Sequence, residues 1–598
     1  MPSNVIGKRF EKLLEKIVWL TESLFATFQM FFIDKIRRRK LIRQVKDSTR
    51  ATMISSLYQA FGTRNPSLTL DIFIYGSITL AFFVVWKLLR SYRNRVIIPV
   101  YDESKGHHWN LIDILSNVVY CNICKSIIVD GMFCDLCGIC ADNNDCHQEA
   151  DTQIPCKSSS VESSEDEHKH HWVRGNLPEN SSCTICGEDI GEEDMIRDFR
   201  CCWCQRTVHE EGICFEKLRD SACDFGEYKH YIIPPGCVKY HKRWLKGKGK
   251  SKVVHSITSM KPTPDWRPLF VVGNRKSGSS DGERILKAYR FILNAIQVVD
   301  TCESVPESGL YWCQILNKAH PDTIPWILVA GGDGTVAWVL ETIDKLKLNP
   351  HPYVGIIPLG TGNDLAHVLG WNRFSSNVQI RNMMECVDLC EIVPLDRWRA
   401  KISPPMFGLS FSYKTCMMNN YLSIGVDALV ALNFHQTRES KLYSWIGSRF
   451  MNKILYFGYG TKDVLERRCS LLNEKIGLEI DGVRQELPQL ESIVLLNIPS
   501  WGGGADIWSI NRGPDNPIPE QSYNDKLVEI VGLYSSFHIG QMMIGLSEPY
   551  RFGQAKSVKI KLFDQLPMQV DGEPWLQHPC TIRLEWQTQA PMLRVDKP

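Results

Sequence analysis

Two glycine-rich loops, each directly after a short apolar run, most constrain what this chain can fold into. Residues 326–329 (WILV) lead into GGDGT at 331–335, and residues 354–357 (VGII) lead into PLGTGND at 358–364. A helical pattern follows each loop, so the stretch predicts a β-α-β-α unit of a parallel sheet. Loops of this kind lie at the carboxyl edge of the sheet, where ligands bind.

The composition of these loops favours a nucleoside triphosphate as the ligand. Glycines let backbone N–H groups approach an anion, and the helix N-termini behind them carry partial positive charge. Asp333 and Asp364 would repel a bare phosphate, which predicts a bridging Mg²⁺. Gly-Asp-Gly is also a common tight turn, and the repetition of the loop at the next strand end favours the functional interpretation.

A third unit of the same form begins with the strand pattern LFVVGN at 269–274. The predicted nucleotide-binding residues are Asn274, Ser277, Gly278, Gly331, Gly332, Asp333, Gly334, Thr335, Gly360, Thr361, Gly362, Asn363 and Asp364. The sequence contains no GxxxxGK[ST] motif of the Walker type and no protein-kinase DFG or HRD set.

Cysteines are concentrated in one part of the chain. Of the 22 cysteines, 14 lie between Cys121 and Cys223, mostly in C-x2-C pairs accompanied by histidines. This spacing is typical of zinc sites rather than disulfides. It predicts two zinc-finger modules, at 107–156 and 170–223, with two structural Zn²⁺ each. About 50 residues of this kind could not form an adequate core without the metal.

The N-terminal region carries two apolar segments. Residues 17–33 precede a basic run, which predicts an interfacial helix within the region 1–67. Residues 68–90 are apolar enough for a membrane anchor, and the arginines that follow place the rest of the chain in the cytosol. A buried core helix is the alternative for 68–90.

The remaining segments complete a multidomain architecture. Residues 157–169 and 239–262 are expected to be polar and basic linkers; the basic one either contacts anionic lipid or is a solvated tether. Residues 265–400 predict a doubly wound α/β lobe and residues 415–595 an antiparallel β-rich lobe, with the active site between the two. The net charge of +2 gives no general bias toward nucleic acid.

Several motifs resemble known families. GGDGT resembles the ATP-binding loop shared by diacylglycerol kinases, sphingosine kinases and NAD kinases. Together with VPLDRW at 393–398, YLSIGVDALVALNFH at 421–435 and QVDGEPW at 569–575, the order of motifs resembles the diacylglycerol kinases, and the anchor with two fingers resembles their epsilon type. The resemblance implies a two-lobed lipid kinase that transfers phosphate from ATP to 1,2-diacyl-sn-glycerol.

The two cysteine modules resemble C1 domains, the diacylglycerol- and phorbol-binding zinc fingers. The resemblance implies the zinc ligands His108, Cys134, Cys137 and Cys156, then Cys121, Cys124, Asp142 and Cys146, in the first module, and His170, Cys201, Cys204 and Cys223, then Cys183, Cys186, His209 and Cys214, in the second. Asp142 replaces the usual histidine, and Cys140 or Asp145 are alternatives to it. Lipid binding and a role in protein docking or autoinhibition remain equally open for the modules.

The QVDGEPW resemblance implies the catalytic groups. Glu573 is expected to act as general base on the acceptor hydroxyl, with Asp571 supporting the metal or the turn and Asp333 holding the nucleotide metal. Asp427 is a candidate for the lipid headgroup or a metal, its alternative being a helix N-cap.

The expected function is that of an ATP- and Mg²⁺-dependent lipid kinase in second-messenger signalling, with a preference for arachidonoyl-diacylglycerol. The expected partners are diacylglycerol, membrane lipids and ATP, not nucleic acid, at the cytosolic side of the endoplasmic reticulum or plasma membrane. A sphingosine- or ceramide-type kinase and a non-catalytic lipid-binding scaffold are the alternatives.

Overall fold

The structure is a computed structural model of the 598-residue chain. It describes residue 98 and residues 100–595, with gaps at 103–104, 113–118, 143–144, 159–167, 192–195, 242–252, 258–264, 361, 372–379, 405–413, 440–468, 511–516 and 544–545. The predicted interfacial helix, the predicted membrane anchor at 68–90 and most of the linker at 157–169 lie outside these residues. Among the helices that are described, none is both long enough and apolar enough to cross a bilayer.

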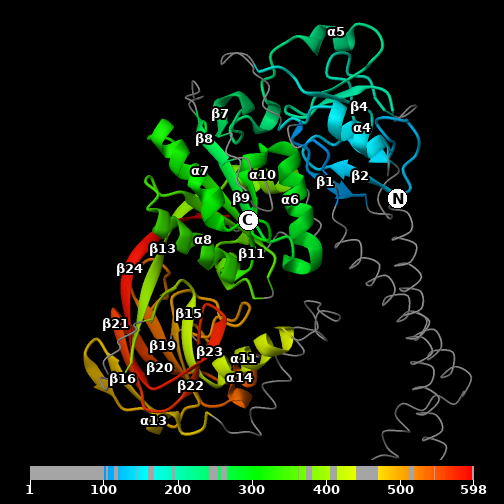
Figure 1. Cartoon of the computed structure of the whole chain (residues 1–598). Coiled ribbons are helices and arrows are strands. Elements are labelled where there is room, and N and C mark those ends of the chain that lie inside the picture. The colour runs from blue at the N-terminus through cyan, green and yellow to red at the C-terminus, as the bar shows by residue number, and fades with distance from the viewer. Residues whose placement is uncertain are drawn as a thin grey trace, which may run out of the picture. The chain divides into compact units, whose positions relative to one another are not determined.

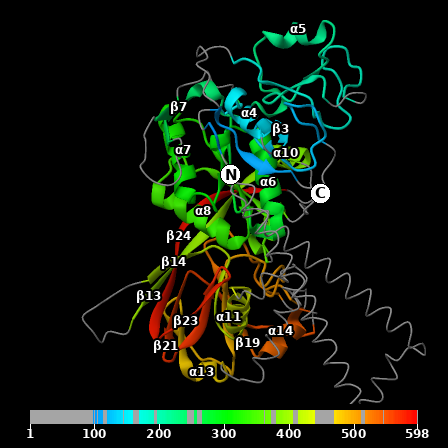
Figure 2. The same cartoon turned by 45° about the vertical axis from the view of Figure 1, so that its right-hand side comes forward.

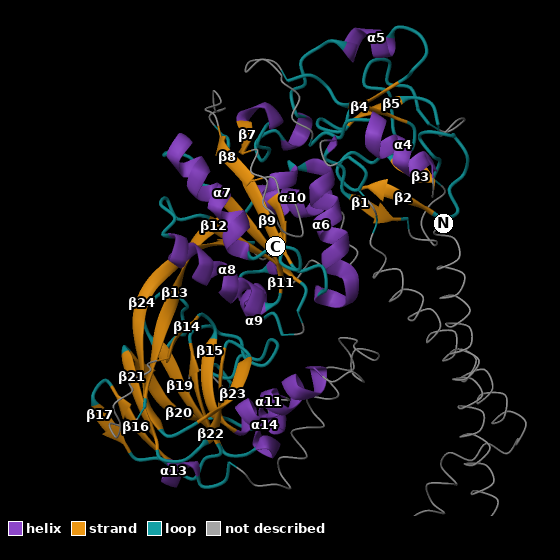
Figure 3. Cartoon of the chain, in the orientation of Figure 1, coloured by secondary structure: helices purple, strands orange, loops and turns teal. Residues whose placement is uncertain are grey.

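Each cysteine module is a small antiparallel sheet with one short helix (Figure 3). The first contains β1 (Trp109–Leu111), β2 (Gly131–Cys134), β3 (Cys140–Asp142) and α4 (Asp145–Gln153), and the second β4 (Trp172–Arg174), β5 (Phe199–Cys201), β6 (Thr207–Val208) and α5 (Cys214–Arg219). Strands of two to four residues bury little apolar surface, so these modules need another source of stability.

The α/β lobe follows the predicted pattern. Its elements are β9 (Leu269–Gly273), α6 (Asp281–Ile292), β10 (Val298–Asp300), α7 (Pro306–Ala319), β11 (Trp326–Gly331), α8 (Asp333–Leu346), β12 (Tyr353–Pro358), α9 (Asp364–Val368) and α10 (Ile380–Asp388). The four strands pair in parallel in the order β10-β9-β11-β12. Strand order reverses between β9 and β11, so the loops after these strands border the crevice in which doubly wound sheets bind ligands.

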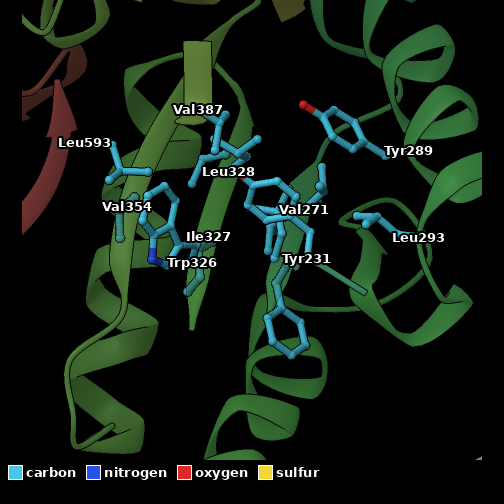
Figure 4. Close-up of a cluster of buried hydrophobic side chains, with 14 of the residues drawn as sticks. Tyr231, Val271, Tyr289, Leu293, Trp326, Ile327, Leu328, Val354, Val387 and Leu593 are labelled. Carbon is cyan, nitrogen blue, oxygen red and sulfur yellow. The ribbon is translucent and has the colours of Figure 1, made fainter. Parts of the chain in front are cut away.

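The strands of this lobe are apolar throughout because both faces of the sheet are covered. β9 and β11 are buried at every position. Figure 4 shows Val271, Ile327 and Leu328 gathered with side chains from other segments, among them Tyr231 and Leu593. The core of the lobe therefore includes residues from before and after the α/β segment.

Two long strands carry the chain between the lobes. β13 (Glu391–Ser403) and β24 (Cys580–Arg594) pair antiparallel along their whole length, and β24 also pairs with β12 through Met592 and Val354 (Figures 1 and 2). The C-terminal strand thus returns to the α/β lobe, and one sheet runs through both lobes.

The second lobe is antiparallel and β-rich, as predicted. It contains β14 (Lys414–Met418), β15 (Tyr421–Gly425), α11 (Val426–Glu439), α13 (Leu472–Lys475), β16 (Ile476–Ile480), β17 (Val483–Gln485), β18 (Ser492–Leu496), β19 (Val528–Leu533), α14 (Ser536–Met543), β20 (Tyr550–Ala555), β21 (Ser557–Leu562), β22 (Leu566–Val570) and β23 (Glu573–Gln577). Six of the strands form a separate sheet in the order β20-β19-β18-β15-β22-β23.

The VPLDRW residues join the two lobes. Arg397 is fully buried and donates to Asp344 on α8 at 2.6 Å and to Asn419 at 3.0 Å. Trp398, also fully buried, donates to Asn497 at 2.8 Å. A buried guanidinium needs such partners to offset the loss of hydration, so this motif has a structural role at the lobe junction.

The predicted linkers are more ordered at their ends than expected. Part of the basic segment forms a hairpin, β7 (Val238–His241) with β8 (Val253–Ile257), and the residues between the strands lie outside the description. Lys157, expected to begin a polar linker, is buried and donates to the main-chain oxygen of Phe291 at 2.7 Å. The hairpin and the buried Lys157 have the same cause: packing against the α/β lobe outweighs the polar character of the local sequence.

Gln297 is one of the side chains that fix the segment leaving the second module to the α/β lobe. Gln297, fully buried, accepts from the Ile233 N–H at 2.8 Å and donates to the main-chain oxygens of Tyr231 and Leu269 at 2.7 Å each. One amide therefore pairs with three buried backbone groups, of which the Tyr231 oxygen also accepts from the Leu269 N–H at 3.1 Å.

Replacing Gln297 with Leu should destabilise the chain, because it removes the amide that pairs with the Ile233 N–H and the Leu269 oxygen. The expected loss is about 3 kcal/mol, from about 1–3 kcal/mol for each buried unpaired group. Denaturant unfolding followed by tryptophan fluorescence measures it. Gln485→Leu, on an exposed hairpin, is the control; equal midpoints for the two variants would contradict this role.

Candidate active site and zinc clusters

The two glycine loops touch each other through their backbones. The Leu359 N–H donates to the Gly331 oxygen at 2.9 Å, and β11 and β12 end in register there. A Cβ atom on Gly360 would lie 2.8 Å from the Gly332 Cα and 2.6 Å from Asn363 Oδ1. Real side chains do not make such contacts, so glycine at 360 is required for the loops to meet. The N-termini of α8 and α9 consequently open onto one place, as an anion site requires.

The third predicted loop packs against the second. Gly278 has a φ of +63°, and a Cβ there would lie 3.2 Å from the Leu359 oxygen. The side-chain oxygen of Asn274 accepts from the Lys276 N–H at 2.9 Å, so it holds its own loop. Ser277 begins the turn that precedes α6. The structure therefore brings all three loops together, with Asn274 shaping its loop from within.

Asp333 lies between the two loops in the first turn of α8. Its carboxylate accepts from the Asp364 N–H at 3.1 Å and the Leu365 N–H at 3.2 Å, and thereby caps α9. Burial, followed by the nearby charge of Asp364, raises its pKa to about 7, and hydrogen bonds from Leu365 and Asn420 only partly offset this. The charge of Asp333 is thus incompletely compensated by the protein alone.

Asp364 is held by the second lobe. Its carboxylate is almost fully buried and accepts from Ser500 Oγ at 2.6 Å, from the Gly503 and Gly504 N–H groups at 3.0 Å, and from Tyr421 Oη at 3.2 Å. Both oxygens are occupied by these donors. Asp364 was predicted to hold the nucleotide metal, whereas in the structure its hydrogen bonds join the nucleotide loop to the second lobe.

The other residues of the PLGTGND loop complete the floor of the site. Asn363 adopts a left-handed conformation, with φ of 54°, and donates to the Gly360 oxygen at 3.0 Å. Its Oδ1 atom is buried between the loops, and no donor among the described residues reaches it. A Cβ on Gly362 would lie 3.7 Å from Asp333 Oδ2. Thr361 lies outside the described residues.

Glu573 faces this floor from the second lobe. It begins β23 and is exposed, and its Oε1 atom is 3.0 Å from the position that a Cβ on Gly334 would occupy. The carboxylate therefore lies against the first turn of α8, beside Asp333. Since Gly334 has no side chain, the Glu573 carboxylate can pack directly against the GGDGT loop, where a larger residue would push it away.

Asp571 supports the turn that carries Glu573. Its carboxylate accepts from the Asn419 N–H at 2.8 Å, the Asn420 N–H at 2.7 Å and the Tyr421 N–H at 3.2 Å. Burial raises its pKa to about 6, and these hydrogen bonds act against the rise. Of the two predicted roles, metal or turn, the geometry supports the turn, and its place among the catalytic residues stays a prediction.

Asp427 does not reach the site. It is 1% exposed at the start of α11, where Ser492 donates to it and Gln569 donates to it at 3.2 Å. Burial raises its pKa. Its predicted role toward the lipid headgroup or a metal is corrected to an internal one, because Ser492 and Gln569 each donate to one of its two buried carboxylate oxygens.

Three sets of four cysteine and histidine residues, and one set of three cysteines, are arranged as zinc ligands are. Each set lies within 4.8 Å: His107, Cys134, Cys137 and Cys156; Cys121, Cys124 and Cys146; His170, Cys201, Cys204 and Cys223; Cys183, Cys186, His209 and Cys214. A tetrahedral ion with Zn–S bonds of about 2.3 Å separates its ligand atoms by about 3.8 Å. The Cys134–Cys156 and Cys201–Cys223 sulfur pairs are 3.8 and 3.9 Å apart. The residues therefore fit zinc.

The first module departs from the predicted ligands. His107, not His108, joins Cys137, with Nδ1 3.5 Å from the sulfur, while its Nε2 contacts the Ile154 oxygen at 2.9 Å. Adjacent residues in extended chain point to opposite sides, and His108 turns to Asp135 at 2.8 Å. Neither Asp142 nor its alternatives Cys140 and Asp145 belong to the set around Cys121.

Several residues that hold the site were not predicted. They are Asn419, Asn420, Tyr421, Ser500, Gly503 and Gly504. The run of three glycines at 502–504 is the one signal that could have found the last two, since glycine runs indicate a close backbone approach.

Comparison with known families agrees with this geometry. The family "Diacylglycerol kinase catalytic domain" matches residues 268–392, "Diacylglycerol kinase accessory domain" matches 417–574, and "Phorbol esters/diacylglycerol binding domain (C1 domain)" matches 170–224. "Diacylglycerol kinase 2" of Arabidopsis thaliana is 30% identical over 569 residues, covering 77% of this chain and 78% of that protein. The chain belongs to the diacylglycerol kinase family.

Other relatives are longer than this chain. "Probable diacylglycerol kinase 3" of Caenorhabditis elegans is 34% identical over 540 residues, which cover 82% of this chain and 64% of that protein. A solved structure of a diacylglycerol kinase from Bacillus anthracis str. Sterne is 18% identical, covers 55% of this chain and 97% of that chain, and superposes with a TM-score of 0.33. The chain spans less than two thirds of the length of the Caenorhabditis elegans relative.

The zinc assignment predicts different outcomes for the two neighbouring histidines. His107→Ala should lower the zinc content by one equivalent per chain, because it removes one of four ligands, whereas His108→Ala should keep the full content. Metal analysis of the two purified variants measures this. Loss of zinc from the His108 variant alone would restore the ligand that the sequence suggested.

The raised pKa of Asp333 predicts a pH-dependent stability difference. Because the folded pKa lies above the unfolded one, ionising Asp333 lowers stability progressively as pH rises from about 4 to about 7. Without added Mg²⁺, Asp333→Asn should therefore unfold at a temperature about 2 °C or more above the parent chain at pH 8, and at nearly the same temperature at pH 4.

Differential scanning fluorimetry across pH measures this difference. The exposed Asp322→Asn is the control and should follow the parent chain at every pH. A constant offset between Asp333→Asn and the parent from pH 4 to pH 8 would contradict an uncompensated carboxylate at this position.

Proposed function

We propose that this member of the diacylglycerol kinase family transfers the γ-phosphate of ATP to the free hydroxyl of 1,2-diacyl-sn-glycerol, giving phosphatidic acid. The observation that carries the proposal is the position of Glu573. It is an exposed carboxylate lying 3.0 Å from the Cβ position of Gly334, directly over the loop that presents helix N-termini to a phosphate chain. A base on one side and an anion cradle on the other are the two parts that phosphoryl transfer needs.

The three loops would hold ATP through backbone N–H groups. Gly332, Gly360 and Gly362 leave room for the phosphates, and the N-terminus of α8 favours their negative charge. Asp333 and Oδ1 of Asn363, which meets no donor in the described part of the chain, would offer oxygen atoms to Mg²⁺. Bound with ATP, Mg²⁺ would neutralise charge on the phosphates and so ease departure of ADP.

Glu573 would accept the proton of the lipid hydroxyl during transfer. Its exposure leaves it room to contact a substrate, whereas Asp571 beneath it is committed to the backbone of the β14–β15 turn. The β14–β15 turn also places the Asn420 side chain at Asp333 and the Tyr421 hydroxyl at Asp364, the two acids of the nucleotide loops. The base and the nucleotide site are thus positioned by one hydrogen-bonded unit.

The finer features of the proposal rest on sequence resemblance. We assign the chain to the epsilon type, with a preference for arachidonoyl-diacylglycerol in lipid signalling. We further propose that 107–156 is a second C1-type module, that both modules contribute lipid contacts, and that 68–90 attaches the chain to the endoplasmic reticulum or plasma membrane with the lobes in the cytosol. The zinc sets and three-stranded sheets common to both modules support the proposal that 107–156 is a second C1-type module.

The role of Glu573 is tested by substitution with Gln. Glu573→Gln should lower phosphate transfer to diacylglycerol in mixed micelles by about 100-fold or more, the usual contribution of a positioned base. Nucleotide binding should persist, since the loops are untouched. Glu585→Gln, an exposed acid on β24, is the matched control.

Substrate choice tests the lipid assignment with the same assay. Transfer to 1-stearoyl-2-arachidonoyl-glycerol above dioleoylglycerol supports both the activity and the acyl preference, and equal transfer supports the activity alone. Transfer to sphingosine or ceramide in place of diacylglycerol would contradict the proposed substrate, and transfer to no lipid by the parent chain would contradict the activity.

A further inference from the structure

A buried carboxylate in the first zinc module is neutralised by the α/β lobe. Asp135 lies between Cys134 and Cys137 in the metal-binding turn, and its side chain is 1% exposed. A carboxylate removed from water needs opposite charges close by. His108 Nδ1, within the module, is 2.8 Å away, and Arg290 Nη1, from α6 of the lobe, is 3.3 Å away.

The charges continue from Arg290 toward the nucleotide site. Arg290 Nη2 and His108 Nε2 each lie 3.9 Å from the carboxylate of Glu303. Glu303 Oε1 in turn pairs with Arg275 Nη1 at 2.6 Å. Arg275 Nε also contacts the buried Asp300 at 3.3 Å. We call these alternating charges from Asp135 through Arg290, Glu303 and Arg275 to Asp300 the charge chain.

The charge chain ends on the loop after β9. Arg275 directly follows Asn274, and its own N–H donates to Asp300 at 3.4 Å, so the loop is held by both its side chain and its backbone. The same loop contains Gly278, which packs on Leu359 of the PLGTGND loop. A shift of Arg275 would therefore move the wall of the nucleotide site.

Other contacts dock the modules on α6 independently of the charge chain. Lys157 donates to the Phe291 oxygen at 2.7 Å and lies 4.8 Å from the Trp203 ring centroid. Arg200 of the second module lies 4.2 Å from the Phe291 ring centroid and donates to the Cys137 oxygen at 3.2 Å. In Figure 1 the first module accordingly lies beside α6. Removing one charge would thus leave the interface in place.

We propose that Asp135 and Arg290 are positioning residues for the nucleotide: through Glu303 and Arg275, the docked first zinc module holds the loop at 274–278 in the conformation that binds ATP. The module then acts on the affinity for ATP, separately from any contact it makes with lipid. This inference rests on the proposed function only in taking the loop as part of the ATP site.

A double-mutant cycle between the module and the lobe tests the coupling. Asp135→Asn removes the charge in the module, and Glu303→Gln breaks the charge chain at an exposed position that leaves both modules intact. Each variant should weaken binding of a fluorescent ATP analogue to the full-length chain about 5-fold, the lower end of ordinary coupling between sites. The double variant should be no weaker than either single one, because both changes break the same connection.

The steady-state constants separate positioning from a general structural role. In both single variants the KM for ATP should rise about 5-fold, while the KM for diacylglycerol and the kcat stay within twofold of the parent. Lys157→Met is the matched control: it weakens the same interface without touching the charge chain, and should bind the analogue like the parent chain.

Three results would overturn the inference. These are unchanged analogue binding in Glu303→Gln, effects of Asp135→Asn and Glu303→Gln that multiply in the double variant, and an equal loss of binding in Lys157→Met. If Asp135→Asn loses zinc on metal analysis, Arg290→Met replaces it in the cycle from the lobe side. Analogue binding needs no lipid turnover, so failure of the diacylglycerol assay would count against the proposed function and leave this test readable.

Discussion

The carboxylate of Asp364 is the contact on which the arrangement of the active site depends. It belongs to a nucleotide loop of the α/β lobe, yet its hydrogen-bond donors are Ser500, Gly503, Gly504 and Tyr421 of the second lobe. Its own N–H meanwhile donates to Asp333. A buried carboxylate with this many donors fixes the distance between the lobes, since any opening would leave the charge unpaired. Glu573 of the second lobe is thereby held against the GGDGT loop.

The zinc modules are built into the same structure. The core of the α/β lobe is continuous with Cys201, Trp203 and Phe225 of the second module, and Tyr231 reaches the sheet (Figure 4). Such packing differs from that of a recruitment module on a flexible tether. Metal binding by the second module and folding of the lobe are consequently connected, because the set with Cys201, Cys204 and Cys223 contributes its cysteines to the core of the lobe.

Much of the fold could be predicted because the relevant signals are local. Apolar runs that end in glycine gave the parallel strands and their loops, and alternating patterns with Asp-Gly turns gave the β-rich lobe. The spacing of the module could not show whether His107 or His108 is the zinc ligand, since that depends on which way each ring points. His108 points to a charge cluster with Arg290 and Glu303, which are more than 180 residues away in sequence.

The acids of the site show the same limit. Glu573, Asp571 and Asp364 are alike in the sequence, and their roles differ only through partners supplied by distant segments. The Asp571 carboxylate accepts from the backbone N–H groups of 419–421, and the Asp364 carboxylate accepts from those of 503–504. The Glu573 carboxylate instead lies against Gly334. Asp427 was a candidate for the lipid headgroup or a metal, with a helix N-cap as the alternative, and its buried carboxylate instead accepts from Ser492 and Gln569.

The most direct test of this account is phosphate transfer from ATP to diacylglycerol by the Asp364→Asn variant, compared with the parent chain. The Asn side chain keeps the size of Asp but presents an amide to the donors of Ser500 and Gly503. The account predicts a loss of about 100-fold or more, the size expected when catalytic groups are displaced by about 1 Å, with both lobes still folded. Transfer within twofold of the parent chain would contradict it.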